Sequence, residues 1–475
     1  MTNVITAPHP RGGPPCTFTA RSPEEIEGIA GNLAAAQREW AARGVQGRIG
    51  VMGRWRAALL ERRAEIVGAL AEDTGRRALC EAEFDGSVRR LDYWAEKAPA
   101  LLGSVSKGVS ETVPGVRYEH NLTPLGLVGV IGPWNFPLLL VLIDTLPALL
   151  AGCAVLAKPS EVTPRFVEPL IDAVESVPEL AGALRIVQGG AKTGEAIVEC
   201  ADAVCFTGSV PTGRRVGAQA GRRLIPAFLE LGGKDPLIVL ADADLDTAVA
   251  VALRASAIAT GQACQSIERV YVHDSMYARF VERLVAAAGR VRLTAGRAGA
   301  GHLGPFIDPA QADRVQAQLA DAEARGATRH CGGVERRKDG DWCAPAVLTG
   351  VNHDMLLFRE ETFGPVIPVM AFEDDAEAVR LANDSEFGLS AAVLGDESHA
   401  LAVARRLWAG AVSINDGGLT AQVSDVEKES FGVSGLGRSR TGPSALLRFL
   451  RKQALLIQTG TPAPIEAFEE TGNPD

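Results

Sequence analysis

The sequence is poor in several residue types, and each scarcity excludes a class of protein. Aromatic residues make up 5% of the 475 positions, and cysteine accounts for 8 of them. Eight cysteines are too few for a disulfide scaffold at this length, and none forms a CxxC pair or stands beside histidines at zinc-like spacing. We therefore expect reduced thiols and no metal site.

Basic residues are also in deficit, with 48 Lys and Arg against 58 Asp and Glu and a formal net charge of −10. This balance gives no long-range attraction for polyphosphates or anionic bilayers, so we expect neither nucleic acid nor membrane as a partner. The longest uncharged run, 121–143, is interrupted by Pro124, Pro133 and Pro137, which predicts buried core rather than a membrane span. The first residues lack the apolar stretch of a secretory signal, which predicts a flexible tail over 1–20 and a cytoplasmic location.

Hydrophobic patterning indicates an α/β fold. Residues 24–100 have helical periodicity, typical of two or three amphipathic helices. Five short apolar strands then alternate with helices, at 127–132, 154–159, 184–189, 203–208 and 227–232. Such alternation predicts a doubly wound parallel sheet whose ligands lie at the carboxyl ends of the strands. A second alternation over about 233–430 predicts another α/β unit, and the acidic, Pro-containing residues 461–475 predict a flexible C-terminal tail.

Two strand ends of the first unit carry candidate cofactor-binding residues. After the fourth strand come Gly208 and Ser209, and Gly213 lies in the first turn of the next helix, where backbone N–H groups can face a pyrophosphate. The spacing is not GxGxxG, so an ordinary strand-to-helix turn is the alternative. After the second strand, Lys158 and Glu161 can hydrogen-bond an adenosine ribose, and the acid favours NAD over NADP. The alternative for both is a solvated loop charge.

Three residues are candidates for catalysis. Cys264 lies in a connection, GQACQS, which suits a nucleophile better than the cysteines inside apolar segments. Glu230 stands in the apolar run AFLELGG, where a partly dehydrated carboxylate is suited to general-base work, although a carboxylate paired to backbone amides is the alternative. Asn135 in PWNFP can donate to an oxyanion, but from its position alone a helix N-cap is favoured.

These residues together carry a family resemblance. The motifs PWNFP, KPSE, FTGS, LELGGKDP, GQACQS and EETFGPV occur in this order, and the chain resembles the aldehyde dehydrogenase superfamily over nearly its whole length. The resemblance implies that Cys264 is the nucleophile, Glu230 the base, and Asn135 the oxyanion donor together with the Cys264 amide. It also implies cofactor-contacting roles for six side chains: Lys158 and Glu161 at the adenosine ribose, Trp134 and Ser209 along the cleft, and Glu361 and Phe363 at the nicotinamide ribose and ring.

The implied reaction is the NAD-dependent oxidation of an aldehyde to a carboxylic acid. A cysteine thiohemiacetal and a thioester form in turn, and water activated by Glu230 hydrolyses the thioester. The nearest rival is a CoA-acylating dehydrogenase, which shares the thioester but commonly lacks the base, so Glu230 argues against it. The other alternative is a catalytically silent structural member of the fold. The sequence does not identify the aldehyde.

The resemblance also implies a domain division. Residues 21–110 and 125–232 form the NAD-binding domain, 233–444 the catalytic domain, and 111–124 with 445–460 a small β oligomerisation arm, so that a homodimer or homotetramer is expected.

The sequence departs from the family pattern in two places. The segment 430–438 reads SFGVSGLGR, which alters the loop at the substrate mouth. The stretch around Arg451 is basic where some relatives have an acidic residue. Glu268, four residues after Cys264, is interpreted as a surface or strand-edge charge.

Overall fold

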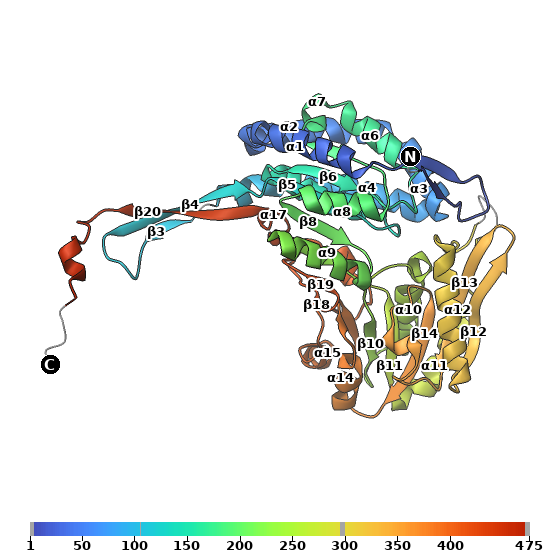
Figure 1. Ribbon diagram of the computed structural model, residues 1–475. Helices are drawn as coiled ribbons and strands as arrows, with labels where there is room; N and C mark the ends of the chain where they lie inside the picture. The colour runs from blue at the N-terminus through green and yellow to red at the C-terminus, as the bar shows by residue number, and fades with distance from the viewer. Residues whose placement is uncertain (1–3, 105, 295–299, 471–475) are drawn as a thin grey trace.

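The computed structural model describes residues 4–104, 106–294 and 300–470. Figure 1 shows two sheet-centred units side by side and a long β arm that projects from the first of them. Where two or three helices were expected before the first sheet, the chain forms four: α1 (Pro23–Ala42), α2 (Gly44–Glu61), α3 (Arg63–Thr74) and α4 (Arg77–Gly103). Among the described residues, none of the helices combines the length and apolar content needed to cross a bilayer.

The first unit contains a six-stranded sheet with the order β19-β9-β8-β5-β6-β7. Its strands are β5 (Leu127–Ile131), β6 (Ala154–Lys158), β7 (Leu184–Ile186), β8 (Ala203–Thr207), β9 (Ala227–Glu230) and β19 (Gly435–Leu436). Its helices are α5 (Leu139–Ala151), α6 (Val167–Glu175), α7 (Pro178–Ala181), α8 (Ala191–Cys200), α9 (Val210–Arg223) and α17 (Ser444–Leu447). Strands β5 to β9 are parallel, and every residue of β5, β6 and β8 is buried because helices cover both faces.

The second unit contains a seven-stranded sheet with the order β12-β13-β14-β11-β10-β16-β17, parallel except for β12. Its strands are β10 (Asp235–Val239), β11 (Ile267–His273), β12 (Thr328–Arg337), β13 (Gly340–Thr349), β14 (Val366–Phe372), β16 (Ala391–Leu394) and β17 (Val412–Ile414). Its helices are α10 (Leu245–Ala257), the 3-10 helix η1 (Ile258–Gly261), α11 (Asp274–Ala288), α12 (Pro309–Ala324), α13 (Leu356–Arg359), α14 (Asp375–Asn383), α15 (Glu397–Ala404) and α16 (Leu419–Gln422). A two-residue pairing joins β15 (Phe387–Gly388) to β18 (Phe431–Gly432).

The arm is a three-stranded antiparallel sheet of β3 (Lys107–Val109), β4 (Val116–Pro124) and β20 (Leu450–Gln458). It extends away from the first unit, and the short 3-10 helix η2 (Ile465–Phe468) follows it (Figure 1). Apolar side chains are uncovered along the arm, with Val109 65% exposed and Leu456 73% exposed. The predicted α/β class, with two parallel-sheet units and a β arm, is confirmed.

The predicted domain limits need three corrections. The described part of the expected N-terminal tail is a hairpin of β1 (Val4–Ala7) and β2 (Cys16–Thr19), held because His9 is buried against Glu72 at 2.8 Å and Arg165 donates to the Pro14 carbonyl. Residues 445–449 belong to the first core rather than to the arm, since Ala445, Leu446 and Phe449 are fully buried there. Strand β19 lies within the predicted catalytic domain but completes the first sheet by pairing with β9. Of the predicted C-terminal tail, 471–475 lie outside the described residues, and 461–470 are exposed.

Candidate active site

Cys264 lies in the turn between η1 and β11, half-buried at the junction of the two units. The three residues before Gln262 all have left-handed backbone, with φ of 57° at Ala259, 59° at Thr260 and 68° at Gly261. A side chain on Gly261 would place its Cβ 2.2 Å from the carbonyl carbon of Gly364. The Cys264 turn therefore packs directly on the 361–364 turn, and only glycine permits this approach.

Asn135 lies in the loop after β5 and is 4% exposed. Its Nδ2 donates to the Gln262 carbonyl at 3.0 Å, and its own carbonyl accepts from Arg76, which also donates to Ala259. The side-chain amide has two hydrogens, so this bond leaves one for another acceptor. The N-cap alternative is wrong, because α5 begins at Leu139 and Asn135 makes no capping bond.

Glu230 is the last residue of β9, aligned with Thr207 on one neighbouring strand and Gly435 on the other. Its carboxylate is half-buried and accepts a hydrogen bond from Ser430 Oγ at 3.0 Å. Glu230 therefore lies at the carboxyl end of the first sheet, where the doubly wound topology places ligands.

One cavity of about 260 Å³ brings the three predicted catalytic residues together. It is lined by Asn135, Glu230 and Cys264, and also by Glu361 and Phe363. A reacting carbon beside the Cys264 sulfur would thus be within the same small space as an amide donor and a carboxylate.

A larger cleft of about 1030 Å³ adjoins this cavity and shares Trp134, Gly208 and Ser209 with it. Lys158 and Glu161 line its far part, with Lys158 Nζ 3.0 Å from Glu161 Oε2 and 2.8 Å from the Gly189 carbonyl. Near the cavity, the rings of Trp134 and Phe363 meet edge to face at 5.4 Å. The cleft and the cavity are therefore neighbours, and their joint lining includes both Lys158 and Cys264.

Gly213 is not one of the residues that line the cleft or the cavity. It lies in the first turn of α9, and a Cβ there would stand 2.4 Å from Leu231 Cδ2. This glycine lets α9 pack closely on the segment after β9. Cofactor contact at Gly213 stays a prediction, and the closeness of Leu231 gives the glycine a packing role as well.

Comparisons with known proteins identify the family. Residues 3–455 match the aldehyde dehydrogenase family profile. The chain belongs to the aldehyde dehydrogenase family. A solved structure of an aldehyde dehydrogenase, PutA from Anabaena variabilis, named so provisionally, superposes with a TM-score of 0.94 at 47% identity, covering 97% of this chain and 99% of that one.

Two other relatives of this aldehyde dehydrogenase differ in the cofactor they are associated with. A Mycolicibacterium smegmatis protein, provisionally named succinate-semialdehyde dehydrogenase [NADP(+)], is 36% identical over 92% of this chain and 86% of its own. Betaine aldehyde dehydrogenase of Staphylococcus aureus, solved with NAD+, has a TM-score of 0.90 at 28% identity, covering 98% of this chain and 94% of that one.

The active-site carboxylates of this aldehyde dehydrogenase affect the thiol. Burial, followed by the negative charges of Glu361, Asp235 and Glu230, raises the pKa of Cys264 to about 12. Burial, followed by the charge of Glu268, raises the pKa of Glu361 to about 8. A thiol with so high a pKa is protonated at neutral pH, and it would need a base in order to act as a nucleophile.

Sequence reasoning missed several residues of the site. Gln311 and Arg314 of α12 line the cavity beside Glu361, and Arg76 ties the Asn135 loop to the Cys264 turn. The pair Asp308-Pro309 is a typical helix start and predicts α12. The sequence around α12 does not indicate that Gln311 and Arg314 lie next to Glu361. Glu268 was interpreted wrongly: it is 2% exposed and paired with Lys234, because three donors surround it.

Proposed function

We propose that this aldehyde dehydrogenase oxidises an aldehyde to a carboxylic acid with NAD, through a covalent intermediate on Cys264. The observation that carries the proposal is the shared cavity, in which Cys264, Glu230 and Asn135 face the same space and the cofactor cleft opens onto it. NAD, when bound, supplies the two-electron oxidant.

The chain's own residues divide the remaining work. We assign Glu230, which lines the same cavity as Cys264, as the base that takes the thiol proton, and the thiolate adds to the aldehyde carbon to form a thiohemiacetal. The Asn135 amide donates to the oxyanion that develops on the former carbonyl oxygen. After oxidation the carbon is held as a thioester. Glu230, once it has released the thiol proton to solvent, removes a proton from the water that hydrolyses the thioester and passes that proton to the departing sulfur. The carboxylic acid leaves and the thiol is restored.

The preference for NAD over NADP rests on Glu161. Its carboxylate is held beside Lys158, at the end of the cleft where an adenosine ribose fits. An acid accepts hydrogen bonds from the ribose hydroxyls and repels a 2′-phosphate. This supports NAD for the present chain even though the Mycolicibacterium relative is named for NADP.

The test is steady-state oxidation of aliphatic, aromatic and charged aldehydes with NAD or NADP, with and without CoA. We expect NADH and free acid without CoA from the wild type, and none from Cys264→Ala. Glu230→Gln, whose amide can take a proton neither from the Cys264 thiol nor from water, should form NADH at least about 100-fold more slowly than wild type, while Glu429→Gln, an exposed neighbour of Ser430, should turn over normally. NADH formation that needs CoA would replace the hydrolytic proposal with acyl transfer, and no NADH from any aldehyde would favour a silent member of the fold.

We also propose that the protein assembles as a homodimer or homotetramer through its arm. The uncovered strands β3 and β20 bear apolar residues that a second copy would bury, and an unpaired strand edge is otherwise prone to aggregation. We further propose a cytoplasmic location, supported by all eight cysteines being free thiols.

A further inference from the structure

One buried ion pair joins the nucleophile segment to the base segment. Glu268 follows Cys264 by four residues, and Lys234 follows Glu230 by four. Lys234 Nζ lies 2.7 Å from Glu268 Oε2, and the side chains are 0% and 3% exposed. A pair this dry is tolerated only when hydrogen bonds satisfy its remaining donors and acceptors. The other partners of Glu268 are therefore informative.

Those partners all belong to the 361–364 turn. Glu268 accepts from the Thr362 N–H on Oε2 and from the Phe363 N–H on Oε1, both at 2.8 Å. Lys234 Nζ also donates to Thr362 Oγ1 at 2.8 Å. Phe363 has φ of 53°, in the left-handed region that residues other than glycine rarely adopt. The ion pair thus holds a backbone conformation that the turn does not favour by itself.

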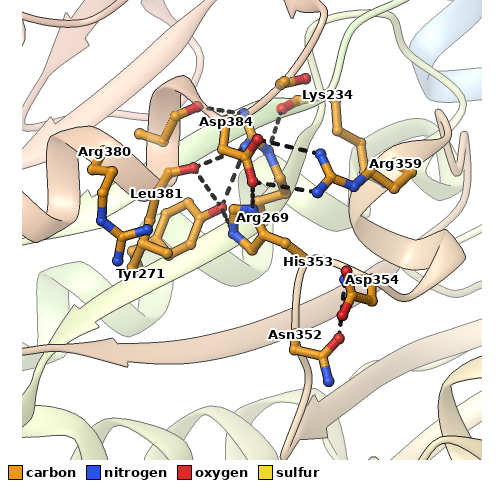
Figure 2. A network of polar contacts seen from close by, with 12 residues as sticks. Lys234, Arg269, Tyr271, Asn352, His353, Asp354, Arg359, Arg380, Leu381 and Asp384 are labelled. Carbon is orange, nitrogen blue, oxygen red and sulfur yellow. Dashed lines mark hydrogen bonds and ion pairs between the residues drawn. The ribbon is translucent and has the colours of Figure 1, made fainter.

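The ion pair is supported from outside the site by a polar network. Figure 2 shows the Arg269 guanidinium reaching the Lys234 carbonyl, to which it donates at 2.8 Å. Arg269 also donates to the carbonyls of Leu381 and Ala382, so the backbone at Lys234 is fixed to the rest of the second unit. The support is rigid, because Arg269 is 2% exposed.

The turn that Glu268 holds presents two side chains to the cofactor cavity. Glu361 Oε1 accepts from the Gly233 N–H at 3.2 Å, and the Phe363 ring contacts Trp134. Both side chains line the cavity that contains Cys264. A shift of the turn would move these two side chains directly, whereas the thiol and the base belong to other segments and do not contact Glu268.

We propose that Glu268 is a positioning residue that holds the 361–363 turn so that Glu361 and Phe363 meet the nicotinamide half of the cofactor. The proposal rests on the proposed function only for the identity of that cofactor. Two carboxylate oxygens accept from three donors here, and an amide cannot replace them, because its NH2 group would face a donor. Glu268→Gln therefore tests the role with almost no change in volume.

The first measurements separate cofactor binding from thiol chemistry. NAD binding is followed by quenching of tryptophan fluorescence, and cofactor-free hydrolysis of p-nitrophenyl acetate reports on Cys264 and Glu230 alone. We expect Glu268→Gln to weaken NAD binding about 10- to 100-fold, as for the loss of a hydrogen bond to a charged group. Ester hydrolysis should stay within about twofold of wild type, because neither catalytic side chain contacts Glu268. Glu360→Gln, an exposed neighbour of the turn, is the matched control and should change neither quantity.

A pH profile of NAD binding gives a readout that a purely structural role would not move. The charged groups around Glu361 are Glu268 and Lys234, Arg314 of α12 and the Cys264 thiol. Since the Glu361 carboxylate accepts ribose hydroxyls best when ionised, wild-type binding should strengthen with a midpoint near the Glu361 pKa of about 8. Removing the Glu268 charge should lower that midpoint by about one pH unit.

The remaining outcomes decide the proposal. Unchanged NAD binding in Glu268→Gln overturns it, as does an equal loss of NAD binding and ester hydrolysis with an unmoved pH midpoint. If the unpaired Lys234 ammonium prevents folding, the neutral pair Lys234→Met/Glu268→Gln is measured instead, with the same expected loss of NAD binding. A wild type that binds NAD but oxidises no aldehyde would contradict the proposed function. The NAD-binding measurements on Glu268→Gln would still test the present proposal.

Discussion

Replacing Glu161, which we propose contacts the adenosine ribose, should change which nicotinamide cofactor the enzyme uses. Glu161 is 39% exposed at its side chain and lies 3.0 Å from Lys158 Nζ. A 2′-phosphate with two negative charges at about 5 Å from this carboxylate is repelled by about 1.7 kcal/mol in a water-like dielectric, or roughly 20-fold in affinity. Glu161→Gln removes this repulsion, and it also removes a charged acceptor for the ribose hydroxyls, which is worth about 1.5 kcal/mol or more.

Both effects favour NADP in the variant. We expect kcat/KM for NADP to rise roughly 20-fold and that for NAD to fall about 10-fold, so the NAD-to-NADP ratio should fall by about two orders of magnitude. The assay is initial-rate kinetics with each cofactor at a saturating aldehyde concentration. Glu175→Gln, at the end of α6 and outside the cleft, controls for the change in net charge. A Glu161→Gln enzyme with the wild-type ratio would refute the assignment of Glu161 to the ribose.

Three further predictions concern the oxyanion, the thiol and the arm. Asn135→Ala should lower kcat about 10²- to 10³-fold with NAD binding unchanged, measured by steady-state kinetics and fluorescence; an unaltered kcat would remove the amide from the reaction. Because the pKa of Cys264 is raised to about 12, the thiolate fraction and so the alkylation rate by iodoacetamide should rise about tenfold per pH unit from about pH 7 to 10 in cofactor-free enzyme. The Cys264→Ala background is subtracted, and a plateau near pH 8 would contradict the raised pKa. Leu456→Glu on β20 should yield a smaller species by light scattering, whereas a mass equal to that of wild type would show that the arm is not the contact.

The parallel strands were predictable because their physics is local. Strands β5, β6 and β8 are short runs of buried apolar residues, and the predicted ranges agree with the observed ones within one residue. The catalytic candidates were also within reach, since Asn135 and Glu230 stand at the carboxyl ends of β5 and β9. Cys264 comes from the turn before β11 of the second sheet, so its place in the same cavity depends on how the two units pack together.

The partners of buried charges were not predictable, because they are distant in sequence. Glu268 reads as a strand-edge charge beside its neighbours, yet it bonds to Lys234 and to Thr362, which are 34 and 94 residues away. The N-terminal residues have the Pro and Gly content of a loose tail, but one buried contact between His9 and Glu72 fixes them against α3. The composition of a short segment does not indicate which distant residue will pair with a buried charge.

The chain returns from the second unit to the first, and this limits how the two units can be exchanged between genes. Strand β19 and the buried residues 445–449 complete a sheet and core whose other members end at Glu230. A gene fragment ending after that residue would lack its edge strand and the Phe449 ring, so neither half could be exchanged by a single crossover. A protease cut within the exposed residues 425–427 should therefore leave a nicked enzyme whose two pieces stay associated.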